Sequence, residues 1–369
     1  MAKLKLQIAK PDWLILGLTS AFVTFGLLAI FDASSVVAAR DFGNKFYYVQ
    51  NQAIWAGLGF VALLFFSLFD YHKLARLAPF GIVIVLILLG LVLIPQIGGE
   101  VLGAKRRFAI SGIIIQPSEI AKLVYLIFLA FRFSKLSQKT FTLWQFLAIT
   151  LVILALIILE PDLGTAVIIG ATGFLIYFLA GAPLRNFIVL GLIFTGGIIS
   201  LIFTSGYRSA RLASFLNLGI DTQGISYHQN QILLGLATGG LTGSGFGQSL
   251  QKFYYLPEAA TDSIFAVIGE EFGFLGATAI ILGFIILLFR GVKIASLAPD
   301  DLGRLMASGI VFLISLQVII NIAGQVALLP LTGVPLPFIS YGGSSLITLM
   351  SAVGILINIS RQRVARSKQ

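Results

Sequence analysis

The chain has 369 residues, of which 58% are hydrophobic and 11% are charged, and its formal net charge is +10. Because soluble domains carry about 25% charged residues, this composition indicates a polytopic membrane protein and excludes an ordinary soluble domain. The lack of cysteine excludes disulfides and thiol chemistry, and the two distant histidines, His72 and His228, do not suggest a metal site.

Ten apolar segments are long enough to cross a bilayer, since a span needs about 20 mainly apolar residues. The N-terminal residues before the first segment contain no small-residue cleavage site, so we expect a retained helix and not a signal peptide. We expect an all-α polytopic membrane protein, with one transmembrane domain over residues 1–369 and a long extracytoplasmic loop between helices 7 and 8. The spans run roughly over 12–33, 49–69, 74–95, 117–134, 143–160, 163–181, 185–204, 262–290, 304–328 and 342–361.

Lysine and arginine in the connections predict the orientation of these spans. With the N-terminus inside, 16 of the 25 basic residues fall on the inner side, eight fall on the outer side and Lys122 lies within the fourth span. This bias places both termini in the cytoplasm. It also explains the net positive charge without a nucleic-acid partner.

Two basic groups on the outer side run against that rule. One is Lys105, Arg106 and Arg107, and the other is Arg208 and Arg211. Topology does not require them there, so one interpretation is anion binding, because arginine offers phosphate or pyrophosphate a bidentate fork. The alternative is contact with anionic lipid headgroups.

Polar residues also mark the starts of two predicted helices. Pro117 and Glu119 are typical of a helix N-terminus, and Lys122 follows one turn later. Glu160 and Asp162 flank the turn before the sixth span. Asp162 is interpreted either as a helix cap or as a ligand or arginine partner.

The connection over roughly 205–261 is far longer than the usual few residues between elements. Its glycine-rich core, residues 235–247, is compatible with a re-entrant or interfacial segment. A second irregular stretch, residues 329–346, has three prolines and three glycines and is interpreted mainly as a rigid outer hairpin.

Four of the 15 acidic residues fall within 14 positions, at Glu258, Asp262, Glu270 and Glu271. Asp262 lies at the outer start of the eighth span, after Thr261 as a candidate N-cap. It either complements the helix dipole or acts as a general base. Glu270 and Glu271 lie roughly 12–13 Å deeper along a helix and are candidates for structural ion pairs.

Lys122 is a candidate partner for these deeper acids, being a lone cation in another span. No P-loop, GxSxG element, HExxH or Cys/His metal pattern is present, so ATP hydrolysis, serine hydrolysis and zinc catalysis have no supporting motif.

Six motifs resemble, in order, those of the SEDS proteins (shape, elongation, division and sporulation). They are GAKRRFAI, QPSEIAKL, EPDLGTAVII, YHQNQILLGLATGGLTGSGFGQS, YYLPEAATDSIFAVIGEEFGFLG and LPLTGVPLPFISYGGSSL. The resemblance covers nearly the whole chain, and division-type and rod-shape-type members are both close. It implies ten membrane helices, cytoplasmic termini and a multi-pass protein of the bacterial cytoplasmic membrane.

The resemblance also implies peptidoglycan glycosyltransferase activity on lipid II. The family's essential aspartate corresponds to Asp262, its basic and acidic motif residues to Arg106, Lys122 and Asp162. The chain departs from the common pattern at four positions, where it has Arg107, Tyr254, Ala260 and Ser263.

In the implied reaction, Asp262 removes a proton from the acceptor's 4-hydroxyl, which attacks the anomeric carbon of the donor with inversion. Cations stabilise the departing undecaprenyl pyrophosphate. Arg106 and Lys122 are candidates, beside Lys105, with Arg208, Arg211 or a divalent cation (Mg²⁺ or Mn²⁺) as additions, and Glu258 is expected to tune the site. No cofactor is firmly implied.

Two alternatives remain open at this stage. The chain could be a lipid II flippase, or a non-enzymatic scaffold for a penicillin-binding protein. Key polar residues gathered on the outer side favour surface chemistry over transport, which uses sites near the midplane. A class B penicillin-binding protein is the implied protein partner.

Overall fold

The computed structural model describes residues 10–94, 99–101, 104–110, 113–134, 143–203, 206–216, 226–252 and 256–362. Ten helices of the described part correspond to the ten predicted spans. They are α1 (Trp13–Phe42), α2 (Tyr47–Leu68), α3 (Tyr71–Val92), α4 (Pro117–Ser134), α5 (Leu143–Leu159), α6 (Leu163–Leu179), α7 (Leu184–Phe203), α10 (Ile264–Ser296), α11 (Asp301–Gln325) and α12 (Gly343–Arg361).

Two further helices, α8 (Gly206–Leu216) and α9 (Tyr227–Thr238), lie in the long connection. By length and composition, seven helices of the described part can cross a membrane: α1, α2, α3, α7, α10, α11 and α12. α5 and α6 are apolar but only 17 residues long, and α4 carries three charges, Glu119, Lys122 and Arg132. The protein is a multi-pass membrane protein whose membrane-embedded part is all-helical.

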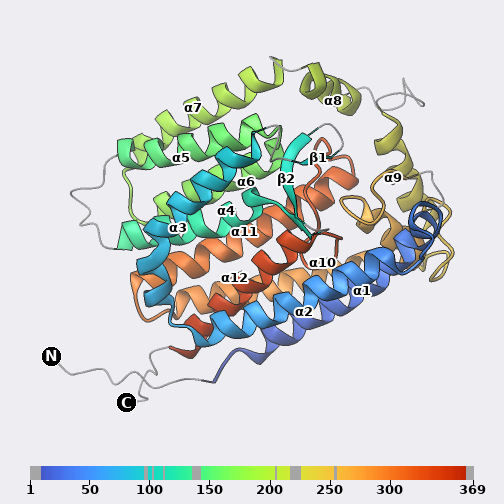
Figure 1. Ribbon diagram of the computed structural model, residues 1–369, viewed down its shortest axis with the longest axis horizontal. Helices are drawn as coiled ribbons and strands as arrows, with labels where there is room; N and C mark the ends of the chain where they lie inside the picture. The colour runs from blue at the N-terminus through green and yellow to red at the C-terminus, as the bar shows by residue number, and fades with distance from the viewer. Residues whose placement is uncertain are drawn as a thin grey trace.

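The helices form an elongated bundle with two distinct ends (Figure 1). α1 begins and α12 ends at one end, which we call the terminal end. The strands and α9 lie toward the opposite end, which we call the loop end. The long connection between α7 and α10 therefore places its described helices and turns around the loop end.

Aspartate side chains fix the starts of four helices. Asp12, Asp70, Asp162 and Asp300 are the N-caps of α1, α3, α6 and α11, and each side chain accepts a hydrogen bond from a first-turn backbone N–H. Such caps satisfy donors that a helix cannot pair internally. Four of the 15 acids in the sequence therefore have a local structural task.

The centre of the bundle is formed by α4, α11 and α12. Buried residues make up 67% of the most apolar window of α11 and 78% of that of α12, against 6% for α7. α12 packs most extensively on α2, and α11 on α10. α7 runs along the edge of the bundle (Figure 1).

A small antiparallel sheet, which the sequence patterns did not predict, lies between α3 and α4. Its strands β1 (Gly99–Val101), β2 (Ala104–Ile110) and β3 (Ile113–Ile115) pair in the order β1-β2-β3. Charged residues in β2 hide an alternating pattern, while the three isoleucines of β3 suit a strand. The sheet carries Lys105 and Arg106 on β2.

Candidate functional site

Asp262 lies in the turn before α10 and is half-buried. α10 begins at Ile264 and its N-cap position is Ser263, whose side chain makes no capping bond. The expectation that Thr261 caps this helix was therefore wrong by two residues. The reason is that side chains from α11 hold the Asp262 carbonyl: Asn321 Nδ2 donates to it at 2.9 Å and Gln325 Nε2 at 2.8 Å.

The loop before α12 lies against this turn. Tyr341 donates its backbone N–H to the Ala260 carbonyl at 2.9 Å. Gly333 has a φ of 72°, and a Cβ placed on it would lie 3.8 Å from Asp262 Oδ2. The predicted outer hairpin therefore forms one wall beside the Asp262 carboxylate.

The same loop contacts the start of α6. A Cβ on Gly164 would lie 2.7 Å from Val334 Cγ2 and 3.2 Å from the Thr332 carbonyl oxygen, so glycine permits this close approach. The loop thus joins the elements that carry Asp162 and Asp262.

Asp162 is buried and caps α6, accepting hydrogen bonds from Thr165 N at 3.0 Å and Thr165 Oγ1 at 2.9 Å. Gln116 Nε2 also donates to Asp162 Oδ2 at 3.1 Å. The Gln116 backbone N–H donates to Ser344 Oγ at 3.0 Å. These bonds fasten the starts of α4, α6 and α12 to one another at the loop end.

Lys122 forms a buried ion pair within α4. Its Nζ lies 2.8 Å from Glu119 Oε1, and the two side chains are 1% and 5% exposed. Glu119 Oε2 has no hydrogen-bond partner among the described residues. Lys122 is therefore paired with Glu119 and not, as considered from the sequence, with Glu270 or Glu271.

Glu258 is exposed beside the Asp262 turn. Thr261 Oγ1 donates to Glu258 Oε2 at 2.7 Å and lies 3.4 Å from Asp262 Oδ1. The backbone of Glu258 has a φ of 52°, in the left-handed region that non-glycine residues rarely occupy. Such strained residues gather at functional sites, which agrees with a place at the mouth of this site.

Four of the outer cations are placed only by their backbones. Lys105 and Arg106 lie on β2, and Arg208 and Arg211 on α8; their side chains fall outside the described part. Arg107 is described, and its charge opposes the rise that burial gives the pKa of the Tyr341 hydroxyl. Arg107, a departure from the family pattern, therefore acts electrostatically on the loop beside Asp262.

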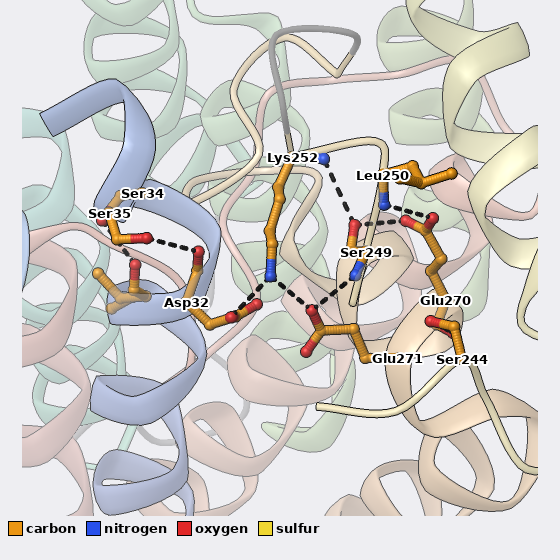
Figure 2. A network of polar contacts seen from close by, with 10 residues as sticks. Asp32, Ser34, Ser35, Ser244, Ser249, Leu250, Lys252, Glu270 and Glu271 are labelled. Carbon is orange, nitrogen blue, oxygen red and sulfur yellow. Dashed lines mark hydrogen bonds and ion pairs between the residues drawn. The ribbon is translucent and has the colours of Figure 1, made fainter. Parts of the chain in front are cut away.

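Figure 2 shows a buried polar network that the sequence did not reveal. Lys252 Nζ donates to Asp32 Oδ1 at 2.7 Å and to Glu271 Oε1 at 2.9 Å. Burial lowers the pKa of the Lys252 ammonium, but its bonds to the two carboxylates outweigh this and raise it. The ion-pair partner of Glu271 is thus Lys252.

Glu270 is held without a cation in the described part of this network. It accepts hydrogen bonds from Ser249 Oγ and, at 2.9 Å, from the Leu250 backbone N–H. Sequence reasoning overlooked Asp32, although an acid within an apolar span is a recognised signal. Its Oδ2 is buried and has no hydrogen-bond partner among the described residues.

The glycine-rich segment over residues 239–249 docks on a break in α10. At Gly273 the backbone leaves helical geometry, with φ 64° and ψ −164°. The Ser244 and Gly245 N–H groups donate to the carbonyls of Glu270 and Glu271, both at 3.0 Å. The segment is thus irregular backbone whose polar groups are satisfied by protein, the condition under which such backbone is tolerated at membrane depth.

An apolar cavity of about 740 Å³ lies between α5, α6 and α7. Its lining includes Leu154, Phe174 and Phe194, and Thr195 is its most polar side chain. No titratable group lines it, so it can hold a hydrocarbon chain but cannot supply acid–base chemistry. Among the described residues, no group of three His, Cys, Asp or Glu side chains could hold a metal ion.

Comparison with known proteins gives consistent matches along the chain. The family model for FtsW, RodA and SpoVE, described as cell cycle protein, matches residues 12–365. Stage V sporulation protein E of Bacillus subtilis (strain 168) is 41% identical over 356 residues, covering 95% of this chain and 97% of the relative. A probable peptidoglycan glycosyltransferase FtsW of Trichlorobacter lovleyi is 38% identical, covering 96% and 94%.

Solved structures are similar in fold as well. A chain from a study of how a peptidoglycan synthase complex coordinates polymerisation and crosslinking superposes with a TM-score of 0.78 at 27% identity, covering 96% of this chain and 98% of that one. The rod shape determining protein RodA of Thermus thermophilus gives a TM-score of 0.70 at 27% identity, with the same coverage.

Proposed function

The chain belongs to the cell cycle protein family of FtsW, RodA and SpoVE, and from this premise we propose that it is a peptidoglycan glycosyltransferase with Asp262 as its general base. The observation that carries the assignment of the base is the position of Asp262. Its carbonyl is fixed by two buried amides while its side chain stays half-buried at the loop end. A fixed backbone and an accessible carboxylate suit a group that must meet a substrate hydroxyl.

The substrate follows from the chemistry that the curated relatives are named for. Lipid II presents a disaccharide on a polyprenyl pyrophosphate, and Asp262 takes the proton of the acceptor's 4-hydroxyl as that oxygen attacks the donor's anomeric carbon. The bond between that carbon and the pyrophosphate breaks, and the pyrophosphate leaves with the electron pair. One base is sufficient, because pyrophosphate leaves without a general acid, and direct displacement inverts the anomeric centre.

The leaving group needs positive charge near it. Arg106 and Lys105 on β2, with Arg208 and Arg211 on α8, are the proposed sources, because these elements lie toward the loop end. Lys122 contributes less charge than its type suggests, since Glu119 neutralises it at 2.8 Å. Asp162 acts mainly by joining the starts of α4 and α6, and Glu258 by its charge beside the carboxylate.

The lipid part of the substrate requires an apolar surface of its own. The cavity between α5, α6 and α7 has the volume and lining for a segment of hydrocarbon chain. We place the polyprenyl chain of one substrate there.

We also propose an orientation in the membrane and a protein partner. The loop end faces outward and both termini lie in the cytoplasm, as the distribution of lysine and arginine supports. A class B penicillin-binding protein is the proposed partner, because a structurally similar chain comes from a peptidoglycan synthase complex that couples polymerisation to crosslinking.

The test is polymerisation of labelled lipid II by the purified chain, with and without a class B penicillin-binding protein. We expect Asp262→Asn to fold and bind lipid II but to lose glycan formation, because the amide cannot accept the proton. Asp301→Asn, an exposed carboxylate at the terminal end, is the matched control and should polymerise normally. Normal glycan strands from Asp262→Asn would remove the assignment of the base.

A further inference from the structure

Two amide side chains one helical turn apart on α11 support the turn that holds Asp262. Asn321 is 3% exposed and Gln325 is 0% exposed, so both are removed from solvent. A buried amide that is not hydrogen-bonded costs free energy, so each of these groups needs defined partners. The partners show what the pair does.

The N–H groups of the pair bind the Asp262 turn, the loop at Val334 and, within the pair, the side-chain oxygen of Asn321. Gln325 Nε2 donates to the Asp262 carbonyl and to Asn321 Oδ1, both at 2.8 Å. Asn321 Nδ2 donates to the carbonyls of Asp262 and Val334, both at 2.9 Å. All four N–H groups of the two amides are therefore used, and none can be released without leaving a buried group unpaired.

Gln325 also replaces a backbone hydrogen bond of α10. In a continuous helix the Ala266 N–H would donate to the Asp262 carbonyl four residues earlier. Here Ala266 N donates to Gln325 Oε1 at 2.7 Å, shared with the Ser263 carbonyl at 3.0 Å, while Gln325 Nε2 donates to the Asp262 carbonyl. The amide stands between the two backbone groups and keeps Asp262 out of the helix.

Asn321 fixes the opposite wall of the site. By holding the carbonyls of Asp262 and Val334 together, it sets the spacing between the Asp262 turn and the loop that contains Gly333. That loop passes so close that a Cβ on Gly333 would lie 3.8 Å from Asp262 Oδ2. The pair thus fixes the backbone position of Asp262 and the position of the loop that lies beside its carboxylate.

We propose that Asn321 and Gln325 are positioning residues that hold Asp262 outside α10, in the geometry needed for proton transfer. The proposal rests on the proposed function, in which Asp262 is the base. Without Gln325, the Ala266 N–H and the Asp262 carbonyl are free to pair directly. The first turn of α10 then extends backward and carries the carboxylate away from the acceptor hydroxyl.

The test compares Gln325→Met with Gln317→Met in the full-length purified chain. Methionine keeps the length of glutamine but removes its hydrogen bonds. Gln317 is a matched control, because it is also fully buried on α11 and its amide has no hydrogen-bond partner among the described residues. The measurements are kcat and KM for labelled lipid II, lipid II binding, and the thermal unfolding midpoint.

We expect Gln325→Met to lower kcat about 10- to 100-fold, since misplacing a catalytic group by about 1 Å has an effect of that size. KM and lipid II affinity should change less than about twofold, because ground-state binding is kept. Gln317→Met should retain the kcat of the parent chain. A loss of folded protein would also lower the apparent kcat at unchanged KM, but it would lower the number of lipid II binding sites per chain in parallel, which the binding measurement detects.

Asn321→Leu provides the second variant, so that poor folding of one does not end the test. In each single variant the Asp262 carbonyl keeps one of its two amide donors, and either variant should show the same loss of kcat. The proposal is overturned if a folded variant keeps the kcat of the parent chain, or if Gln317→Met loses kcat to the same extent. In either case, the polymerisation assay of Asp262→Asn still tests separately whether Asp262 is the base. Normal polymerisation by Asp262→Asn overturns both.

Discussion

At the residue scale, Lys252 is the side chain that permits two carboxylates to share the interior of the protein. It lies within 2.9 Å of both Asp32 and Glu271, and its own side chain is 4% exposed. Isolated charges are costly at this depth, so the three groups stabilise one another only as a set. The set joins α1, α10 and the segment before the Asp262 turn.

We expect Lys252→Met to lower the free energy of unfolding by about 3–5 kcal/mol, the usual cost of removing one partner from a buried ion pair. The reason is that Asp32 and Glu271 would face each other without a cation. Thermal unfolding in detergent measures the effect. Lys45→Met is the matched control, because Lys45 is an exposed lysine of the α1–α2 connection. This variant should unfold at the same temperature as the parent chain.

An unfolding midpoint for Lys252→Met equal to that of Lys45→Met would show that the set of Asp32, Lys252 and Glu271 does not stabilise the fold.

The sequence could not reveal this set in advance, because Lys252 and Asp32 lie 220 positions apart. The Glu119–Lys122 pair was predictable, since residues three apart on a helix face each other. Motif resemblance, in contrast, pointed to Asp262 as the base without any knowledge of its amide supports.

At the element scale, the break in α10 at Gly273 gives the glycine-rich segment its docking site. The carbonyls of Gly240 and Leu241 accept hydrogen bonds from Phe274 N at 2.9 Å and Leu275 N at 3.1 Å. With the bonds on the other side of the break, these replace helical hydrogen bonds that the kink removes. The kink and the segment therefore depend on each other.

We expect Gly273→Ala to destabilise the protein by about 1–3 kcal/mol or more, since its φ of 64° strains an alanine. In addition, the new Cβ would clash with the backbone nitrogen of Gly243. Gly57→Ala on α2 is the control, because a Cβ there meets nothing within 4 Å. The rate of protease cleavage within residues 239–249, compared between the two variants, measures how far the segment has undocked.

Equal protease resistance of Gly273→Ala and Gly57→Ala would show that the segment does not need the break in α10.

Helices were predictable at this scale because membrane spans are long and apolar, and the α4 bounds agree with the predicted 117–134. The strands were not, because the charged residues of β2 hide its alternation, and the α10 kink was not, because it pairs with the distant backbone of residues 240–245. Only the glycines of 235–247 indicated that something must approach closely.

At the scale of the whole molecule, the candidate catalytic residues gather at one end, while the polar contacts of the other end are structural. The terminal end is held by side chains such as Arg290, which lies 2.8 Å from Asp12, and His72, which contacts Asp70 at 2.8 Å and Asp300 at 2.6 Å. These contacts join α10 to the start of α1 and α3 to the start of α11. The loop end instead gathers the half-buried Asp262, the strained Glu258 and the strand with its basic residues.

This division predicts the orientation of the protein in the membrane, and the chain's lack of cysteine makes the prediction simple to test. We expect Asn44→Cys, exposed between α1 and α2 at the loop end, to react with a membrane-impermeant maleimide in intact cells. Ser296→Cys, exposed at the terminal end of α10, should react only after the membrane is opened. The cysteine-free parent chain controls for background, and the reverse labelling pattern would place Asp262 on the cytoplasmic side, away from the surface where glycan strands are assembled.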